Sequence, residues 1–246
     1  MTSSRNIAII VAAGKGERMN SPLPKQFLML NHHPILWHAL KPFLKCVDIH
    51  QIIIAVPERF IETCQNQIIK PLLEELSMND VGPQRIRCVC GGSRRQDSVY
   101  LGLQAIEEPA SIVVIHDGVR PFITETQITS LINQAKEKKA VIFGLTPRDT
   151  IKKVNANNYI TDTIDRSQVK IAQTPQAFSY PLIKRAHLLG QEKRLDATDD
   201  ALLVEYLGEK VFVAPGHPLN IKITTPEDLI LSQGILAEWP LKEILT

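Results

Sequence analysis

The sequence predicts an α/β protein built on a mostly parallel, doubly wound sheet. Five short segments with strand character, at 7–11, 51–56, 85–90, 112–116 and 140–145, alternate with longer segments of helical pattern. Short β-branched apolar runs suit strands that are buried on both faces, and their alternation with helices favours parallel pairing. We therefore expect a Rossmann-like, three-layer α/β/α fold with a protruding β-hairpin arm.

Prolines and a threonine mark the helices between these strands. A proline opens the helix expected over 34–45, and Pro42 inside it predicts a kink or an early end. A second helical pattern over 58–76 is interrupted at Pro71. The polar stretch that follows, 77–84, is expected to be a mobile loop. Thr124 is the expected N-cap of a later helix.

The arm is expected within residues 148–173. Two polar strands, 151–154 and 159–164, flank an asparagine-rich turn at 155–158, which is the pattern of a hairpin. Its sides are too polar for a core element, so we interpret it as protruding. A solvated loop excursion is one alternative, and a dimer contact is the other.

Further elements are expected after the arm. Helices should begin near residue 181 and after a cap at 198–200, and a strand should cover 211–214. Residues 220–223 are interpreted as a short strand with a lysine inside it. Thr225 is followed by proline and two acids, which is a strong signal for the start of a helix.

Length and composition fit one large domain over 1–246. The net charge is +2, with 44% hydrophobic and 22% charged residues, so there is no electrostatic case for nucleic acid or a membrane as the main partner. The N-terminus has the pattern of neither a signal peptide nor a membrane span. Cysteines 46, 64, 88 and 90 lack zinc-site spacing, and a reducing cytoplasm is the expected compartment.

The stretch after the first strand predicts a phosphate site. Gly14 and Gly16 let the backbone turn tightly and present its N–H groups to an anion. Arg18 and Lys25 follow on the same loop and add positive charge. Met19 stands where a dinucleotide fold needs its third glycine, and the Walker pattern is absent. What remains resembles the nucleotidyltransferases that activate sugar and polyol phosphates.

Residues suited to binding a ligand also follow two other predicted strands. Gly91 and Gly92 follow the third strand and lead into a helix, where free backbone amides can bind an anion. The fourth strand ends at His116, and Asp117 follows it directly. Ligands of doubly wound sheets bind outside the carboxyl ends of the strands, so these three strand ends should converge on one crevice.

The ordered set of motifs resembles the 2-C-methyl-D-erythritol 4-phosphate cytidylyltransferase family of the non-mevalonate isoprenoid route. The resemblance runs from Ile9 to Leu229. It is carried by Ala12-Ala13-Gly14-Lys15-Gly16-Glu17-Arg18-Met19, Pro24-Lys25-Gln26, Gly91-Gly92 with Asp97-Ser98-Val99, His116-Asp117 with Arg120-Pro121, Arg148-Asp149-Thr150-Ile151-Lys152, Asp165-Arg166, Thr174-Pro175-Gln176, Thr198-Asp199 and Asn220-Ile221-Lys222.

The resemblance implies a cytidylyltransferase that uses CTP, a methylerythritol 4-phosphate and Mg²⁺ bound mainly through the CTP phosphates. A phosphate oxygen must attack the α-phosphate of a highly charged nucleotide, so repulsion is the obstacle. The nucleophile is already ionised at neutral pH and needs no general base. This agrees with the absence of a Ser-His-Asp or Cys-His signature.

The resemblance also implies the residues that hold CTP. Arg18 and Lys25 would stabilise the α-phosphate, and the Gly14 and Gly16 amides would hold the triphosphate. Asp117 would serve the ribose or, as a weak metal ligand, the magnesium shell; capping the next turn is its structural alternative. The cytosine site would be lined by Ala12, Ala13, Gly91, Gly92 and Ser98.

For the acceptor, the resemblance implies that Arg166 and Lys222 bind its phosphate group and aim it, assisted by Thr150 and Thr174. The family's arm enters the neighbouring subunit's site, so Arg166 and Thr150 should act across a homodimer. Lys222 sits in an apolar context, where a charge is costly without a partner.

Three stretches depart from the usual pattern of this family. Gly118 and Val119 replace two alanines, and we expect added flexibility from the glycine and added bulk beside the ribose from the valine. Ser93 replaces an acid that often follows the glycine pair. The stretch 217–219 lacks a frequent Asp. These departures weaken any side-chain role at Ser93 and any second acid near the metal.

Two other functions remain open from the residues alone. A relative that activates ribitol 5-phosphate with CTP would share the fold, the cytosine site and the cations, and no residue excludes it. A non-catalytic nucleotide-binding subunit could keep the glycine loop while losing the cations. This chain keeps Arg18, Lys25, Arg166 and Lys222, which favours an enzyme.

Overall fold

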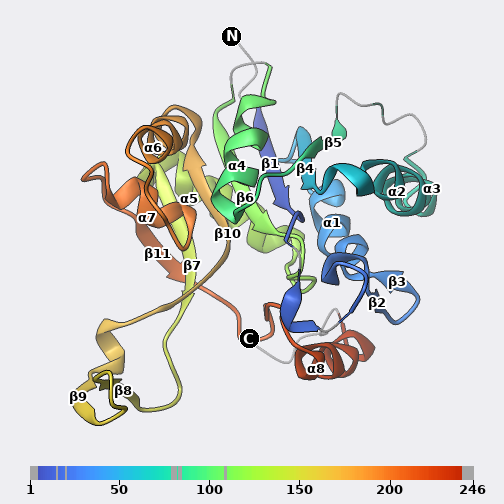
Figure 1. Ribbon diagram of the computed structural model, residues 1–246. Helices are drawn as coiled ribbons and strands as arrows, with labels where there is room; N and C mark the ends of the chain where they lie inside the picture. The colour runs from blue at the N-terminus through green and yellow to red at the C-terminus, as the bar shows by residue number, and fades with distance from the viewer. Residues whose placement is uncertain are drawn as a thin grey trace.

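A seven-stranded sheet forms the centre of the protein, with the order β11-β7-β10-β6-β1-β4-β5 (Figure 1). The computed structural model describes residues 5–14, 16–19, 21–78, 82, 85–107 and 110–239. β1 pairs in parallel with β4 and β6, so the predicted mostly parallel sheet is confirmed. The strands are β1 (Asn6–Val11), β4 (Gln51–Val56), β5 (Ile86–Cys90), β6 (Ile112–Asp117), β7 (Ala140–Leu145), β10 (Ile171–Ser179) and β11 (Phe212–Pro215).

Helices cover both faces of the sheet, as the sequence predicted. Alternate residues of β1 point to opposite faces: Ala8 and Ile10 join the core beside α1 and α5, while Ile7 and Ile9 join the core beside α4, α6 and α7. The helices are α1 (Ile35–Lys45), α4 (Arg95–Gln104), α5 (Glu125–Lys138), α6 (Tyr180–Glu192), α7 (Asp200–Glu205) and α8 (Pro226–Ala237).

Strand β10 was not predicted from the sequence. For this part of the chain the sequence analysis predicted only the helix that follows it. β10 runs antiparallel between β6 and β7, and its register shifts between Gln173 and Gln176. Pro175 lies in that irregularity. Because proline has no N–H to give to a ladder, its presence argues against an inner strand, and the irregular register is what admits it.

The prolines act differently in the two predicted helices. α1 continues through Pro42 and ends within a turn, at Lys45. The 58–76 segment divides into the 3₁₀ turn Glu58–Phe60, α2 (Ile61–Cys64), the π-helical turn Gln65–Ile69 and α3 (Lys70–Glu75). Pro71 stands at the start of α3, where its missing N–H disrupts the regular bonding of the preceding turn. The predicted loop 77–84 lies largely outside the described residues.

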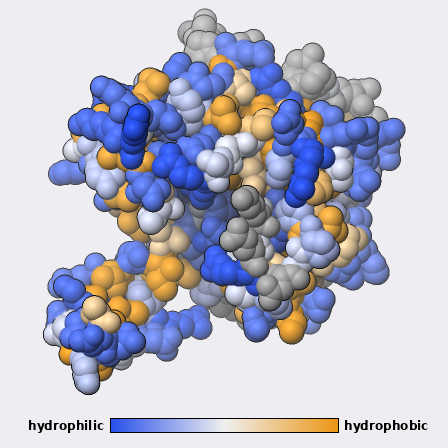
Figure 2. Space-filling view, viewed as in Figure 1, coloured by the Kyte–Doolittle hydropathy of each residue, from blue (hydrophilic) through white to orange (hydrophobic). Residues whose placement is uncertain are grey.

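The hairpin arm is present as predicted. β8 (Ile151–Val154) pairs antiparallel with β9 (Ile160–Ile164), and the pair hangs from the ends of β7 and β10 (Figure 1). In Figure 2 the arm stands off from the body at lower left. The central sheet draws strands from both halves of the chain. That 1–246 is one domain stays a prediction.

One predicted strand was wrong: residues 220–223 take no regular structure. Ile223 donates its N–H to the carbonyl of Val119 at 2.9 Å, and its side chain is buried in a small core closed by α8. The apolar pattern around Lys222 therefore reflects packing under the sheet ends rather than strand pairing. Thr124 and Thr225 cap α5 and α8 as predicted.

Smaller elements complete the chain. Two short antiparallel strands, β2 (Met29–Leu30) and β3 (His33–Pro34), lead into α1. Each helix among the described residues is too short or too polar to span a lipid bilayer.

Candidate active site

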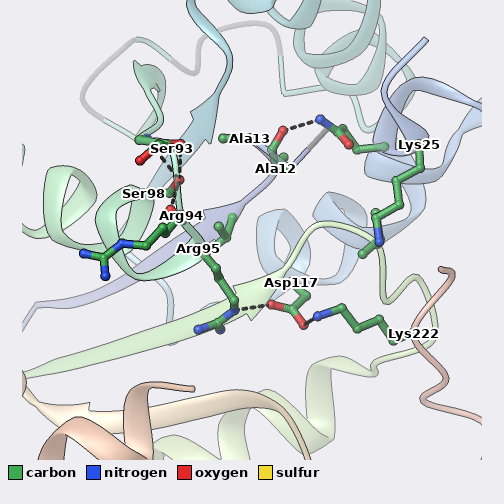
Figure 3. Close-up of a pocket in the computed structure, with 14 residues that line it drawn as sticks. Ala12, Ala13, Lys25, Ser93, Arg94, Arg95, Ser98, Asp117 and Lys222 are labelled. Atoms are coloured by element: carbon green, nitrogen blue, oxygen red, sulfur yellow. Dashed lines mark hydrogen bonds and ion pairs between the residues drawn. The ribbon is translucent and has the colours of Figure 1, made fainter. Parts of the chain in front are cut away.

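A pocket opens at the carboxyl ends of β1 and β6, beside the start of α4 (Figure 3). Four of its lining side chains are lysine or arginine and one is acidic, so the surface is built to receive an anion. The lining residues are Val11, Ala12, Ala13, Gly14, Lys25, Gln26, Gly92, Ser93, Arg94, Arg95, Ser98, Asp117, Val119 and Lys222.

The loop after β1 folds back over Lys25. Gly16 has φ +71°, and a Cβ there would lie 3.1 Å from both the backbone nitrogen and the Cγ of Lys25. Glycine meets both demands because it tolerates this dihedral and lacks the Cβ. The Gln26 side chain donates to the Ala12 carbonyl at 2.5 Å, which ties the two ends of the loop together. Gly14 is exposed, and the space around it is open.

Lys25 stands in a strongly positive environment. Burial, followed by the charges of Lys222 and Arg18, lowers the pKa of its ammonium to about 8. Burial and like charges both disfavour the protonated form, and the like charges come from the same loop, at Arg18, and from a distant segment, at Lys222. Figure 3 shows Lys25 and Lys222 reaching into the same hollow. Arg18 itself is exposed.

Asp117 is the buried counter-charge of this group. Its carboxylate accepts from Arg95 Nε and from Lys222 Nζ, each at 2.8 Å, and Arg120 Nε lies 3.6 Å away. Although burial opposes ionisation, Arg95, Lys222 and Arg120 hold the pKa of Asp117 well below its usual range. The carboxylate therefore organises cations, and the alternative that it caps the next turn was wrong.

The wall opposite Asp117 consists of closely packed backbone. A Cβ at Gly91 would lie 2.2 Å from the Cβ of Ala13, and one at Gly92 would lie 2.4 Å from the Cβ of Asp97. The Ser98 hydroxyl accepts the Gly92 N–H at 3.1 Å and so fixes this turn. Glycines are needed here for close approach, because a side chain at either position would collide with its neighbour.

Comparison with known proteins places this geometry in a family. The model of the 2-C-methyl-D-erythritol 4-phosphate cytidylyltransferase family matches residues 6–238. The chain belongs to this family. A cytidylyltransferase of this name from Alkaliphilus metalliredigens is 44% identical over 235 residues, which are 95% of this chain and 94% of that protein. Another from Clostridium botulinum strain Eklund 17B is 43% identical over 230 residues, 93% and 98% of the two chains.

Solved structures agree with this assignment. The 4-diphosphocytidyl-2C-methyl-D-erythritol synthase of Anaerococcus prevotii superposes with a TM-score of 0.80 at 33% identity, covering 95% of this chain and 96% of that one. The 2-C-methyl-D-erythritol 4-phosphate cytidylyltransferase of Thermus thermophilus gives a TM-score of 0.73 at 27% identity, covering 93% and 98%. The similarity to this family of enzymes therefore extends over the sheet, the pocket and the arm.

Six of the residues predicted for this cytidylyltransferase site are not among those that line the pocket: Gly16, Arg18, Gly91, Thr150, Arg166 and Thr174. Thr174 is buried, and its hydroxyl accepts the Asp117 N–H at 3.0 Å and lies 3.1 Å from His116 Nδ1. Through this hydrogen bond Thr174 holds the backbone of Asp117 in place. Thr150 and Arg166 are exposed on the arm, where Arg166 Nη1 donates to the Arg148 carbonyl at 2.7 Å. Within one chain, the arm stands away from the pocket (Figure 1).

The departures from the family pattern are explained by packing. A Cβ on Gly118 would lie 2.9 Å from Leu36 Cδ1 and 3.1 Å from the Ala12 Cβ. Gly118 thus serves close packing, and the expectation of added flexibility was wrong. Val119 lines the pocket and is buried in the core closed by α8. The Ser93 hydroxyl donates to Asp97 at 3.1 Å.

Arg95 is the pocket residue that sequence reasoning missed. It begins α4, and besides Asp117 it binds Asp200 at 2.7 Å through Nη1. Burial alone would lower the pKa of this guanidinium, but the carboxylates of Asp200 and Asp117 outweigh burial and raise it above its usual value. A signal existed in the sequence, since an arginine pair directly follows the glycine pair at a helix start. The pair alone does not show which of the two arginines points toward Asp117, because that depends on where the helix begins.

Proposed function

We propose that this pocket joins CTP and 2-C-methyl-D-erythritol 4-phosphate to give 4-diphosphocytidyl-2-C-methyl-D-erythritol and pyrophosphate. Family membership fixes the class of reaction, and the curated relatives at 40–44% identity carry this activity in their names. The observation that supports it most strongly is the group of cations around Asp117. Lys25, Arg95, Arg120 and Lys222 come from separate segments and face one carboxylate, which leaves an excess of positive charge.

The chemical step is an in-line displacement at phosphorus. An oxygen of the acceptor phosphate forms a bond to the α-phosphorus of CTP, and the bond from that phosphorus to the bridging oxygen breaks. Pyrophosphate leaves with the electron pair of that bond. Because both reactants are anions, alignment and neutralisation of charge supply the catalysis. Lys25 and Arg18 are proposed to stabilise the charge that develops on the α-phosphate.

CTP is proposed to bind along the wall that runs from the loop after β1 to the start of α4. The Gly14 and Gly16 amides would hold the triphosphate. The cytosine would lie against Ala12, Ala13, Gly91 and Gly92, where the Ser98 hydroxyl fixes the Gly92 turn and backbone groups would meet the polar edge of the base. Asp117 would face the ribose from the floor of the pocket.

The acceptor phosphate is proposed to bind Lys222 from this chain and Arg166 with Thr150 from a partner's arm. Arg166 is exposed and far from its own pocket, so a second copy is the way to complete the site. The arm also exposes Val154, Ile160 and Ile171, whose apolar surfaces an interface would cover. We therefore propose a homodimer that forms through residues 148–173.

Mg²⁺ is proposed to arrive with the nucleotide. The described residues contain no group of three or more His, Cys, Asp or Glu side chains placed to hold a metal ion. Asp117 is the acidic side chain of the pocket, and both of its oxygens already accept from basic groups. These residues fit an ion carried by the phosphates better than one held by the protein. When bound, Mg²⁺ would offset part of the phosphate charge.

The compartment also stays a proposal. All four cysteines are free thiols, which supports the predicted reducing cytoplasm.

A pyrophosphate-release assay tests the function. The purified protein with Mg²⁺ receives each of CTP, UTP, ATP and GTP, combined with 2-C-methyl-D-erythritol 4-phosphate or ribitol 5-phosphate. We expect the highest kcat/KM with CTP and the methylerythritol phosphate, because the relatives share that name. Preference for ribitol 5-phosphate would reassign the acceptor. Absence of pyrophosphate with every pair would favour the non-catalytic alternative and overturn the proposal.

A further inference from the structure

A line of buried charges leads away from the pocket into the helical layer beneath it. Arg95 joins Asp117 at 2.8 Å to Asp200 at 2.7 Å, and Asp200 in turn lies 3.0 Å from the Nε2 of His187. At the other end, Asp117 holds Lys222 at 2.8 Å. The line thus runs from α6 through α7 and α4 to the segment that carries Lys222.

The two far members of this line do not line the pocket. Asp200 is 1% exposed and His187 is 0% exposed, and they belong to α7 and α6. A carboxylate buried this deeply is costly unless cations or donors satisfy it. Arg95 and His187 do so, and against the effect of burial they lower the pKa of Asp200. The pair therefore forms a fixed anionic anchor behind Arg95.

This anchor determines where the Arg95 guanidinium lies. Its Nε and Nη1 bind carboxylates on opposite sides, which leaves the group little freedom to rotate. Without Asp200, Arg95 would remain attached through Asp117 alone and could swing toward the open pocket. Arg95 Nη2 is buried without a hydrogen-bond partner among the described residues, so the two carboxylates carry the whole anchorage.

Lys222 depends on the near end of the same line. Its segment has no strand ladder, and residue 222 itself is held at its ammonium by Asp117. The orientation of the Asp117 carboxylate is set by Arg95 on one oxygen and Lys222 on the other. A shift of Arg95 would therefore move Asp117 and, with it, the lysine that faces the acceptor phosphate.

We propose that Asp200 and His187 are positioning residues for the acceptor-phosphate site, acting through Arg95 and Asp117 on Lys222. The inference rests on the proposed function only for the identity of the acceptor. Its signature is a larger effect on the acceptor than on CTP: Lys222 should shift, whereas the contacts proposed for CTP at Gly14, Gly16 and Gly92 stay in place and only the contact between Asp117 and the ribose is loosened. A purely structural role would weaken both substrates together or lower stability alone.

Three variants test this inference. Asp200→Asn keeps the shape and removes the charge; His187→Leu removes the donor, and His187→Gln restores one at a similar position. We expect Asp200→Asn and His187→Leu to raise the acceptor KM about tenfold, with CTP Kd changed less than about twofold, since small displacements near a reacting group cost this much. His187→Gln should recover most of the loss.

The matched control is Glu209→Gln. It breaks the exposed 2.7 Å ion pair between Glu209 and Arg185 of α6, so it disturbs the same layer without touching the buried line. We expect the acceptor KM of this variant to stay within about twofold of the wild type, because surface pairs contribute little. Thermal unfolding of each variant shows whether it folds. If Asp200→Asn does not fold, the two His187 variants alone test the inference.

A readout without turnover separates this inference from the proposed function. In protein labelled with carbon-13 at lysine Cε, the Lys222 signal should shift in Asp200→Asn and His187→Leu, but not in Glu209→Gln. An unchanged Lys222 signal, or equal losses for CTP and acceptor in folded variants, would overturn the positioning role. An inactive wild type with a shifted Lys222 signal would instead refute the proposed reaction and leave the positioning role standing.

Discussion

Around Asp117 the basic side chains are held by partners within one chain, whereas on the arm Arg166 is exposed and donates to a neighbouring carbonyl. The pocket residues come from the ends of a sheet that is covered on both faces. The arm is a two-stranded hairpin, a structure that is marginal in isolation. The two regions differ in what surrounds their charges: in the pocket the fold buries and pairs them, whereas on the arm Arg166 stays exposed to solvent.

This difference suggests a division of labour. The half of the site that lies in the pocket is prepared before any substrate or partner arrives, because Lys25, Arg95 and Lys222 already share one crevice. The half proposed to clamp the acceptor would be completed by assembly of the proposed homodimer. Changes in the pocket should therefore affect chemistry in each subunit, and changes in the arm should be correctable by a neighbour.

The largest expected effect is that of Lys25→Ala. Loss of a charge aimed at the reacting phosphate should lower kcat by about 10²–10³-fold, while CTP Kd changes much less. Steady-state pyrophosphate release and direct CTP titration measure the two quantities. Lys136→Ala, which removes an exposed lysine from α5, is the control and should behave as wild type. A near-normal kcat in Lys25→Ala would exclude this residue from the chemical step.

Mixing two defective variants probes the arm. Arg166→Ala and Lys25→Ala are each expected to be weakly active, but a mixed dimer would contain one site with an intact pocket and an intact partner arm. Random pairing should restore about a quarter of wild-type activity. The recovery is measured after unfolding and refolding the mixture, with mixed dimers verified by differential tags. If verified mixed dimers regain no activity, Arg166 does not act across subunits.

A smaller effect should appear in the pH dependence. The pKa of Lys25 in the free protein is about 8, below its ordinary value, so its positive charge is lost as pH rises through that value. kcat/KM for CTP should therefore fall above about pH 8. Lys25→Arg, whose guanidinium does not titrate there, should flatten the profile. A wild-type profile that stays level to high pH would contradict the crowding of cations around Lys25.

Much of the fold was predictable because its signals are local. The buried parallel strands, the caps at Thr124 and Thr225 and the asparagine-rich hairpin each follow from short patterns. β10 was missed because Pro175 argues against an inner strand and only the tertiary register makes room for it. The stretch around Lys222 was wrongly predicted to be a strand, because its apolar residues pack into a core without pairing with a neighbouring strand.

The site was predictable where a motif places charge or glycine, and less so where partners are distant in sequence. Gly92 and Lys25 line the pocket, and the roles that the motifs indicate for them stay predictions. Thr174 does not line the pocket, because its hydroxyl is used on the Asp117 N–H. The bond between Arg95 and Asp200 spans a long sequence separation, and no local pattern reveals it.

The central claim is that basic groups from distant segments share one anionic junction, and the pKa of Lys25 tests it most directly. Nuclear magnetic resonance of carbon-13-labelled lysine would measure it in the wild type and in Lys222→Met. We expect about 8 in the wild type and a clear rise toward 10.5 in the variant, because one repelling charge is removed. Lys136→Met should leave it unchanged. A wild-type value near 10.5, or a value that Lys222→Met does not move, would contradict the account.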